Sequence, residues 1–166
     1  MYRDGMSVRG WMVVLGAALG VGLVAYAVWP TAPSPEASRQ LVKRYLETPP
    51  ETRSSGLEHR VMQLRGHAAL GAVGLLGDAR LRGAAHVFLK QCARSGDLKP
   101  PAEIGEIEAR ARSGKRSLVV TTGDVVSSAY AEEEWATIQS AWQRWSQDNQ
   151  PALEAMPRPC DPRYEL

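Results

Sequence analysis

The chain has 166 residues, a formal net charge of +2 and 44% hydrophobic residues. This length allows one modest domain, and a charge this close to zero excludes the strong positive field that nucleic-acid binding requires. A single Phe and 11 prolines indicate a small core whose elements are interrupted by breaks.

The N-terminal part of the chain contains an uncharged apolar run at residues 11–29, after a short tail at 1–10. A helix of about 20 apolar residues spans a hydrocarbon core about 30 Å thick. Trp11 and Trp29 bracket the run, where indole rings favour the headgroup level, and Pro30 ends it. We therefore predict a single-pass transmembrane helix, with the lipid bilayer as its first partner.

The same segment also fits a cleaved signal peptide. Arg3 and Arg9 would form its basic beginning, and Ala25-Tyr26-Ala27 resembles a cleavage site. The apolar part of a signal peptide usually has about 7–15 residues, so the greater length here favours the anchor. Basic residues flank the run on both sides, which leaves its orientation in the membrane open.

Small residues lie along one side of the predicted anchor. Gly16 and Gly20 form a GxxxG pattern, and Gly22 lies nearby. Such residues allow two helix backbones to approach closely in lipid, although they are common in membrane helices in general. The anchor can therefore pair with another helix, and a homodimer is one form that this pairing would take.

A linker at residues 30–35 leads into a predicted helical domain at 36–148. Its first helix is expected at 36–47, with Ser34 as N-cap and Pro35 in the first turn. Four residues form the apolar face of this helix: Leu41, Val42, Tyr45 and Leu46. Consecutive prolines after it predict a loop at 48–56.

A central helical hairpin is predicted next. Residues 57–76 repeat apolar side chains with a helical period, and residues 79–94 do so again. Gly77 interrupts the pattern, and Asp78 is a suitable N-cap for the second helix. A short break between two amphipathic helices is typical of an antiparallel pair.

The segment Ala72-Val73-Gly74-Leu75-Leu76-Gly77-Asp78, preceded by Ala68-Ala69, resembles the turn region of a HEAT repeat. The resemblance covers about residues 64–90 and has no second copy at a fixed period. It implies a helical hairpin used for protein contacts. An ordinary hairpin rich in Ala and Gly is the alternative.

The C-terminal half begins with a short helix expected at 102–112. Residues 117–121 are β-branched and fit a short strand, or else the beginning of a helix. The strongest helix of the domain is predicted at 131–147, with three Glu in its first turn. The proline-rich residues 149–166 are expected to form an extended tail. Overall, we predict a mainly α protein.

A stripe of large apolar side chains follows one face of the 131–147 helix. It consists of Trp135, Ile138, Trp142 and Trp145. Tryptophan is enriched at protein interfaces because it buries a large area and keeps one polar group, so the stripe is a candidate for partner contacts. The alternative is that these side chains form the core of the domain.

Cys92 and Cys160 are the two cysteines of the chain. Their spacing excludes a CxxC redox motif. In an oxidising compartment they can form a disulfide that ties the tail to the hairpin, whereas in the cytosol or the mitochondrial matrix both remain thiols.

No catalytic, cofactor-binding or metal-binding residues are predicted. His59, His67 and His86 lack the spacing of zinc ligands, and no CxxC accompanies them. A cluster of Arg110, Arg112, Lys115 and Arg116 lies next to Gly114 without the Gly and Ser/Thr of a phosphate loop. A solvated loop is the expected structure there.

The sequence therefore predicts a non-enzymatic accessory subunit or assembly factor that is anchored in a membrane and acts through protein partners. The short anchor beside Arg3 and Arg9, and the absence of an N-glycosylation acceptor, favour a mitochondrial membrane. A bacterial inner membrane and the secretory route are alternatives. In the alternative function, the chain is an exported or periplasmic helical domain stabilised by a Cys92–Cys160 disulfide.

Overall fold

The computed structural model describes residues 33–114 and 130–160, and the regular elements of these two ranges are all helical. They are α2 (Pro35–Glu47), the 3-10 helix η1 (Pro50–Thr52), α3 (Ser55–Gln63), α4 (Gly66–Val73), α5 (Arg82–Ser95), α6 (Ala102–Ser113), α7 (Glu132–Asp148) and α8 (Gln150–Glu154). The mainly α class is thus confirmed for this part of the chain.

Three of the sequence predictions lie outside the described residues. They are the transmembrane helix at 11–29, its glycine face (Gly16, Gly20 and Gly22) and the strand at 117–121. Among the helices of the two described ranges, none is long and apolar enough to cross a membrane.

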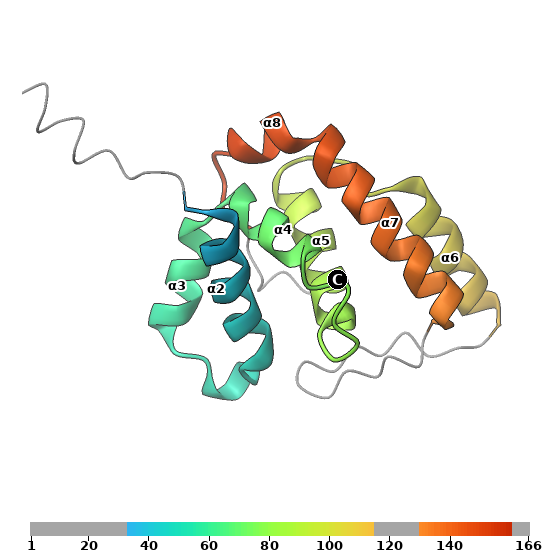
Figure 1. Cartoon of the computed structure of the whole chain (residues 1–166), viewed down its shortest axis with the longest axis horizontal. Coiled ribbons are helices and arrows are strands. Elements are labelled where there is room, and N and C mark those ends of the chain that lie inside the picture. The colour runs from blue at the N-terminus through green and yellow to red at the C-terminus, as the bar shows by residue number, and fades with distance from the viewer. Residues whose placement is uncertain (1–32, 115–129, 161–166) are drawn as a thin grey trace, which may run out of the picture. The chain divides into compact units, whose positions relative to one another are not determined.

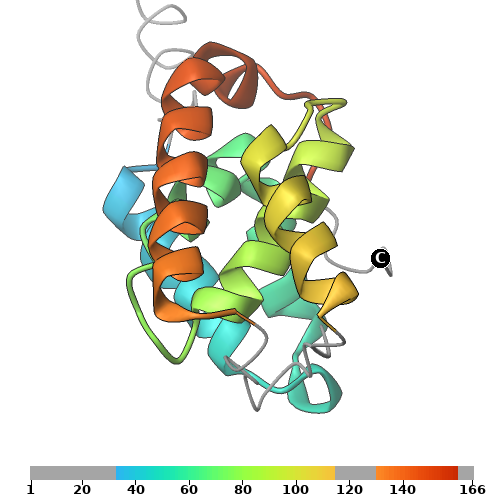
Figure 2. The ribbon, with the colours of Figure 1, turned by 90° about the vertical axis from the view of Figure 1, so that its right-hand side faces the viewer.

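The helices of residues 33–160 surround a central pair. Helices α4 and α5 lie in the middle, with α2 and α3 on one side and α6 and α7 on the other (Figure 1). Helix α4 packs against α2, α5, α7 and α8, and α6 packs against α7. When the molecule is turned, α6 and α7 lie side by side nearest the viewer, with α5 behind them (Figure 2). One continuous apolar cluster fills the space between the helices.

Helix α2 forms as its sequence predicts. The Ser34 hydroxyl accepts a hydrogen bond from the backbone N–H of Ala37 at 3.2 Å, which satisfies one of the free donors of the first turn. Pro35 occupies that turn, where its missing N–H costs nothing. The helix ends at Glu47, just before Pro49 and Pro50.

The first helix of the predicted hairpin is broken in two. A single helix was expected at 57–76, but α3 ends at Gln63 and α4 spans Gly66–Val73. Between them Arg65 has a φ of 51°, a value that non-glycine residues rarely adopt. Gly66 then contacts the backbone of Leu153, so closely that a Cβ on Gly66 would overlap the Leu153 carbonyl. A contact with a distant segment therefore overrides the continuous helical period.

The second helix of the hairpin begins later than predicted. The Asp78 carboxylate accepts a hydrogen bond from the N–H of Arg80 at 2.9 Å and forms a turn instead of a helix cap. Helix α5 begins at Arg82, whose N–H donates to the carbonyl of Asp78 at 2.8 Å. Helices α4 and α5 do pack against each other, while the resemblance to a HEAT repeat stays a prediction.

The C-terminal part contains one confirmed element and one correction. Helix α7 spans Glu132–Asp148, one residue from the predicted bounds at each end, and the Glu134 carboxylate caps its beginning through the N–H of Ala131 at 2.8 Å. The extended tail predicted from residue 149 is wrong for its first part, because α8 forms at Gln150–Glu154. Proline in the first turn of α8 is compatible with a helix, because no N–H is needed there.

The close approach at Gly66 can be tested with a matched pair of glycine substitutions. We expect Gly66→Ala to destabilise the domain by about 1–3 kcal/mol, because the new Cβ must displace the backbone of Leu153. Gly105→Ala, on the exposed side of α6 with nothing near its Cβ, should instead stabilise it by about 1 kcal/mol. Urea denaturation of both variants measures the difference. Equal effects would contradict the role assigned to Gly66.

Candidate functional site

The most unusual polar group of the domain is the imidazole of His86, in the second turn of α5. Only 3% of this residue is exposed. Three aromatic rings surround it in edge-to-face geometry: Tyr130, Trp135 and Trp142, with centroids at 6.0, 6.2 and 6.1 Å. A buried histidine needs partners for both ring nitrogens, since an unpaired polar group in the core is costly.

Both ring nitrogens of His86 have such partners. The indole Nε1–H of Trp142 donates to Nδ1 at 3.0 Å. An indole nitrogen can only donate, so Nδ1 must be unprotonated and accept. The proton of the neutral ring is then on Nε2, which lies 3.4 Å from Oε1 of Glu108 and donates to it. The contacts thus assign the neutral Nε2–H tautomer to His86.

Glu108 receives three donors at its buried position on α6. Besides His86, Lys90 of α5 donates to Oε1 at 2.8 Å, and Arg112 of α6 donates to Oε2 at 3.2 Å. The hydrogen bond from His86, followed by that from Lys90 and the charge of Lys90, lowers the pKa of Glu108 to about 2 against the cost of its burial. The carboxylate is therefore ionised at neutral pH and has its charge balanced within the protein.

The same surroundings keep His86 neutral. Burial is the main cause that lowers the pKa of His86 from its ordinary value of 6.5, and the charge of Lys90 acts in the same direction. The hydrogen bond and the charge of Glu108 oppose this shift. Burial also raises the pKa of Tyr130 to about 12, so its hydroxyl stays neutral.

This arrangement is suited to joining helices. A general base or metal ligand needs a ring nitrogen that can reach an external group. In His86 one nitrogen faces Trp142 of α7 and the other faces Glu108 of α6. The network of Lys90, His86, Glu108 and Trp142 therefore connects α5 to both α6 and α7 by polar contacts across the core. We call these four residues the His86 network.

A second contact joins α5 to the beginning of α7. Arg82 forms a two-point ion pair with Glu132, with distances of 2.8 and 2.7 Å from its two terminal nitrogens. Its guanidinium lies 4.8 Å from the ring centre of Trp135. Since Glu132 is largely exposed, the packing of the guanidinium on the indole is the better-protected part of this contact.

The tryptophan stripe lies in the core of the domain. Trp135 and Trp145 are 5% and 6% exposed, and Ile138 and Trp142 are fully buried. The indole N–H of Trp145 donates to the carbonyl of Lys99 at 2.8 Å. The burial agrees with the core alternative, so the stripe is not an exposed surface for partners in this structure.

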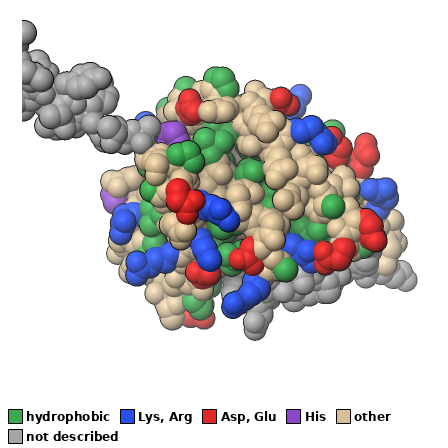
Figure 3. All heavy atoms as spheres, in the orientation of Figure 1, with side chains coloured by type: hydrophobic (Ala, Val, Ile, Leu, Met, Phe, Trp, Pro, Cys, Tyr) green, Lys and Arg blue, Asp and Glu red, His purple; other side chains and the backbone are tan. Residues whose placement is uncertain are grey.

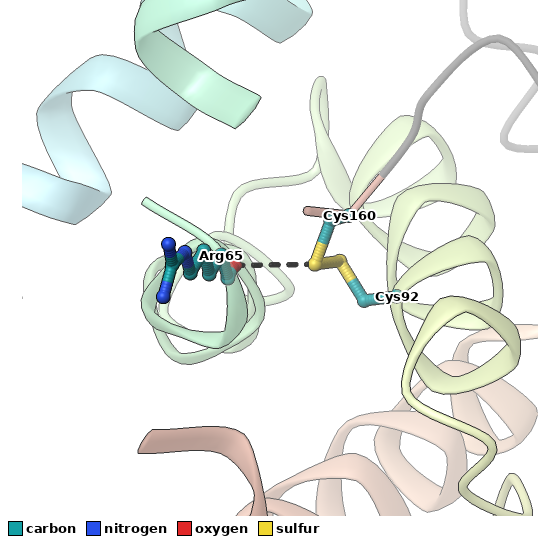
Figure 4. Close-up of a disulfide and its surroundings, with 3 residues drawn as sticks. All are labelled: Arg65, Cys92 and Cys160. Carbon is teal, nitrogen blue, oxygen red and sulfur yellow. Dashed lines mark hydrogen bonds between the residues drawn. A yellow bond between two sulfur atoms is a disulfide. The ribbon is translucent and has the colours of Figure 1, made fainter. Parts of the chain in front are cut away.

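The structure joins Cys92 of α5 to Cys160 near the C-terminus in a disulfide. Their Cα atoms are 4.5 Å apart, they are separated by 68 residues, and both are fully buried. The Cys160 sulfur lies 3.3 Å from the carbonyl oxygen of Arg65. Figure 4 shows this contact beside the disulfide. A disulfide sulfur has no hydrogen to donate, so this contact becomes a hydrogen bond only in the reduced thiol.

The other histidines of the chain do not join this site. His59 is exposed and its Nε2 lies 2.9 Å from the amide nitrogen of Gln63. His67 is partly exposed on α4. Within residues 33–114 and 130–160, no group of three or more His, Cys, Asp or Glu side chains could hold a metal ion.

Sequence reasoning missed Glu108 and Lys90. A signal for Glu108 was available, because it follows Ile107 directly and lies four residues after Ile104, on the side of α6 that becomes buried. A charged residue on a buried helix face requires a partner of opposite charge. The pattern does not reveal which of the basic residues supplies it. Of the predicted basic cluster, Arg112 pairs with Glu108, Arg110 is exposed, and Lys115 and Arg116 lie outside the described residues.

Two glutamate substitutions on α6 test how much the His86 network contributes to the free energy of unfolding. We expect Glu108→Gln to lower the free energy of unfolding by about 1–3 kcal/mol, because Lys90 and His86 lose a charged acceptor in the core. Glu103→Gln removes a carboxylate that pairs with Arg144 in solvent and should change stability far less. Chemical denaturation at pH 7 measures both. A Glu103 variant as destabilised as the Glu108 variant would argue against the network.

Comparison of the chain with protein-family models, with curated proteins and with solved structures finds no match. No family can therefore supply a function for the site. We therefore infer a function from the His86 network, the disulfide and the predicted anchor.

Proposed function

We propose that the chain is a non-enzymatic helical domain that works through protein contacts on the oxidising side of a membrane, to which residues 11–29 tether it. The observation that carries this proposal is the buried Cys92–Cys160 disulfide. It favours the exported or periplasmic alternative of the sequence analysis as the place where the domain works. From the leading interpretation of the sequence we retain the role of an accessory subunit or assembly factor.

The disulfide supports an oxidising compartment for two reasons. Cytosolic and matrix thiols are kept reduced, so structural disulfides are typical of exported proteins. In addition, Cys92 and Cys160 close a loop of 68 residues, for which the chain-entropy model gives a stabilisation of about 4 kcal/mol. A stabilisation of this size is a large part of the free energy of unfolding of a typical domain, which is about 5–15 kcal/mol.

Protein contact fits the described side chains better than catalysis does. Both ring nitrogens of the buried His86 form hydrogen bonds inside the protein. Cys92 is fully buried in the disulfide, so it offers no free thiol. The outward sides of α2, α6 and α7 are polar, and acidic and basic side chains alternate on the face shown in Figure 3. Such surfaces suit polar, specific contacts with a partner.

The predicted membrane anchor would hold the domain near partners in the same membrane. In the sequence, residues 11–29 end six residues before Pro35, where α2 begins. Confinement to a membrane raises the effective concentration of the domain near membrane partners. Pairing through Gly16, Gly20 and Gly22 stays a prediction, and so does the assignment to a mitochondrial membrane.

The state of the two cysteines in the native cell tests the compartment. Cells are lysed directly into denaturant that contains an alkylating maleimide, so that every free thiol is labelled although both cysteines are buried in the folded chain. The full chain is then reduced and alkylated a second time with a maleimide of different mass. We expect the second reagent alone to label Cys92 and Cys160, since a disulfide resists alkylation. Cys160→Ser is the control and should expose one thiol to the first reagent. First-reagent labelling of both cysteines in the native chain would place it in a reducing compartment.

Site-specific photo-crosslinking tests the contact function. A photoreactive residue is placed at exposed positions on three helices, Arg44 of α2, Glu106 of α6 and Gln143 of α7, in the full chain in its own membrane. We expect a discrete adduct with a second protein from at least one of them. Ile138, fully buried in the core, serves as the position that should give none. Failure of every exposed position to give an adduct would contradict a contact function.

A further inference from the structure

We propose that His86 is an acid-sensitive latch that holds α7 against α5 and releases it when its Nδ1 takes up a proton. The proposal does not depend on the compartment or the anchor. It follows from the hydrogen bond that the Trp142 indole donates to Nδ1 at 3.0 Å, inside the core. That bond exists only while His86 is neutral.

The donors and acceptors of the His86 imidazole and the Trp142 indole explain why protonation breaks their hydrogen bond. A proton on Nδ1 places an N–H opposite the indole N–H, and neither group can then accept. Turning the imidazole over does not restore the bond, because both nitrogens of an imidazolium carry hydrogens. Trp142 is fully buried, so its N–H finds no water unless α7 moves. Protonation therefore replaces a satisfied buried pair with two opposed donors.

The groups on the other side of His86 draw it away from α7. Glu108 of α6 accepts from Nε2, and this bond becomes stronger when the ring is charged. Tyr130 and Trp135 add no charge to the ring, and the pKa of Tyr130 is raised to about 12. A charged His86 is thus attracted towards α6 at the same time as it loses its contact with α7.

Other charges around the ring oppose protonation in the closed state. Lys90 of α5 and Arg112 of α6 already share Glu108, so a third cation would face a single carboxylate. The ion pair of Arg82 on α5 with Glu132 on α7 is largely exposed on the Glu132 side. The proton is therefore taken up with opening of the contact with α7.

The pH range of the latch follows from the two titrating groups. The pKa of His86 is lowered in the folded protein, so its contribution to stability is complete above the unfolded value of 6.5 and is lost as the pH falls below it. Glu108 has a folded pKa of about 2 and an ordinary value of 4.5, so its contribution is lost only below 4.5. Between pH 6.5 and 4.5 the latch responds through His86 alone.

The test follows the full chain between pH 7 and pH 5 by urea denaturation and by hydrogen exchange. The unfolding equilibrium constant should rise towards about tenfold for each pH unit below 6.5, as one proton is taken up. Amide protection should fall first in α7, before it falls in α2. His86→Asn keeps an acceptor near the Nδ1 position without titrating, and it should remove this pH dependence. His59→Gln, at an exposed position, should leave it unchanged.

A second variant decides the matter where His86→Asn does not fold. Trp142→Phe keeps His86 but removes the opposing N–H, so its loss of protection in α7 on acidification should be smaller than in the parent chain. Two results would overturn the latch. One is equal pH dependence in the parent and in both variants. The other is loss of protection in α2 together with α7, which indicates global unfolding alone.

Discussion

The hydrogen bond from the Trp142 indole to Nδ1 of His86 is the interaction on which the arrangement of the helices most depends. It fixes the tautomer of His86, and the tautomer in turn directs Nε2–H to Glu108. Glu108 then gathers Lys90 and Arg112, so one chain of polar contacts passes through α7, α5 and α6. Because His86, Glu108 and Trp142 are buried and Lys90 is partly buried, the bonds between these four residues depend on one another.

A disulfide at Cys92 also holds helix α5, at a position that follows His86 and Lys90 in sequence. Cys92 is bonded to Cys160, in the segment after α8, and the Cys160 sulfur contacts the carbonyl of Arg65. Leu153 of α8 contacts the neighbouring Gly66. The network and the disulfide are broken under different conditions. Protonation disrupts the His86 network, whereas a reductant cleaves the disulfide. A domain built in this way keeps its core closed in an oxidising compartment near neutral pH.

The periodicity of apolar residues predicted the helices well where their neighbours in sequence decide the structure. Ser34 and Pro35 begin α2, and the spacing of Trp135, Ile138, Trp142 and Trp145 correctly places one buried face on α7. Distant contacts could not be read in this way. The break at Arg65 depends on the backbone of Leu153, and the partner of Glu108 depends on how α5 and α6 meet. A pattern along one helix carries no information about the helix that packs against it.

The protonation state of the His86 ring is the most direct test of this account. Nitrogen-15 NMR of the full chain, labelled at its histidine side chains and assigned with His86→Asn, distinguishes a protonated ring nitrogen from an unprotonated one. We expect a neutral His86 at pH 7, with its hydrogen on Nε2 and an unprotonated Nδ1 that accepts a hydrogen bond from Trp142. A hydrogen on Nδ1, in either the neutral or the charged ring, would contradict it.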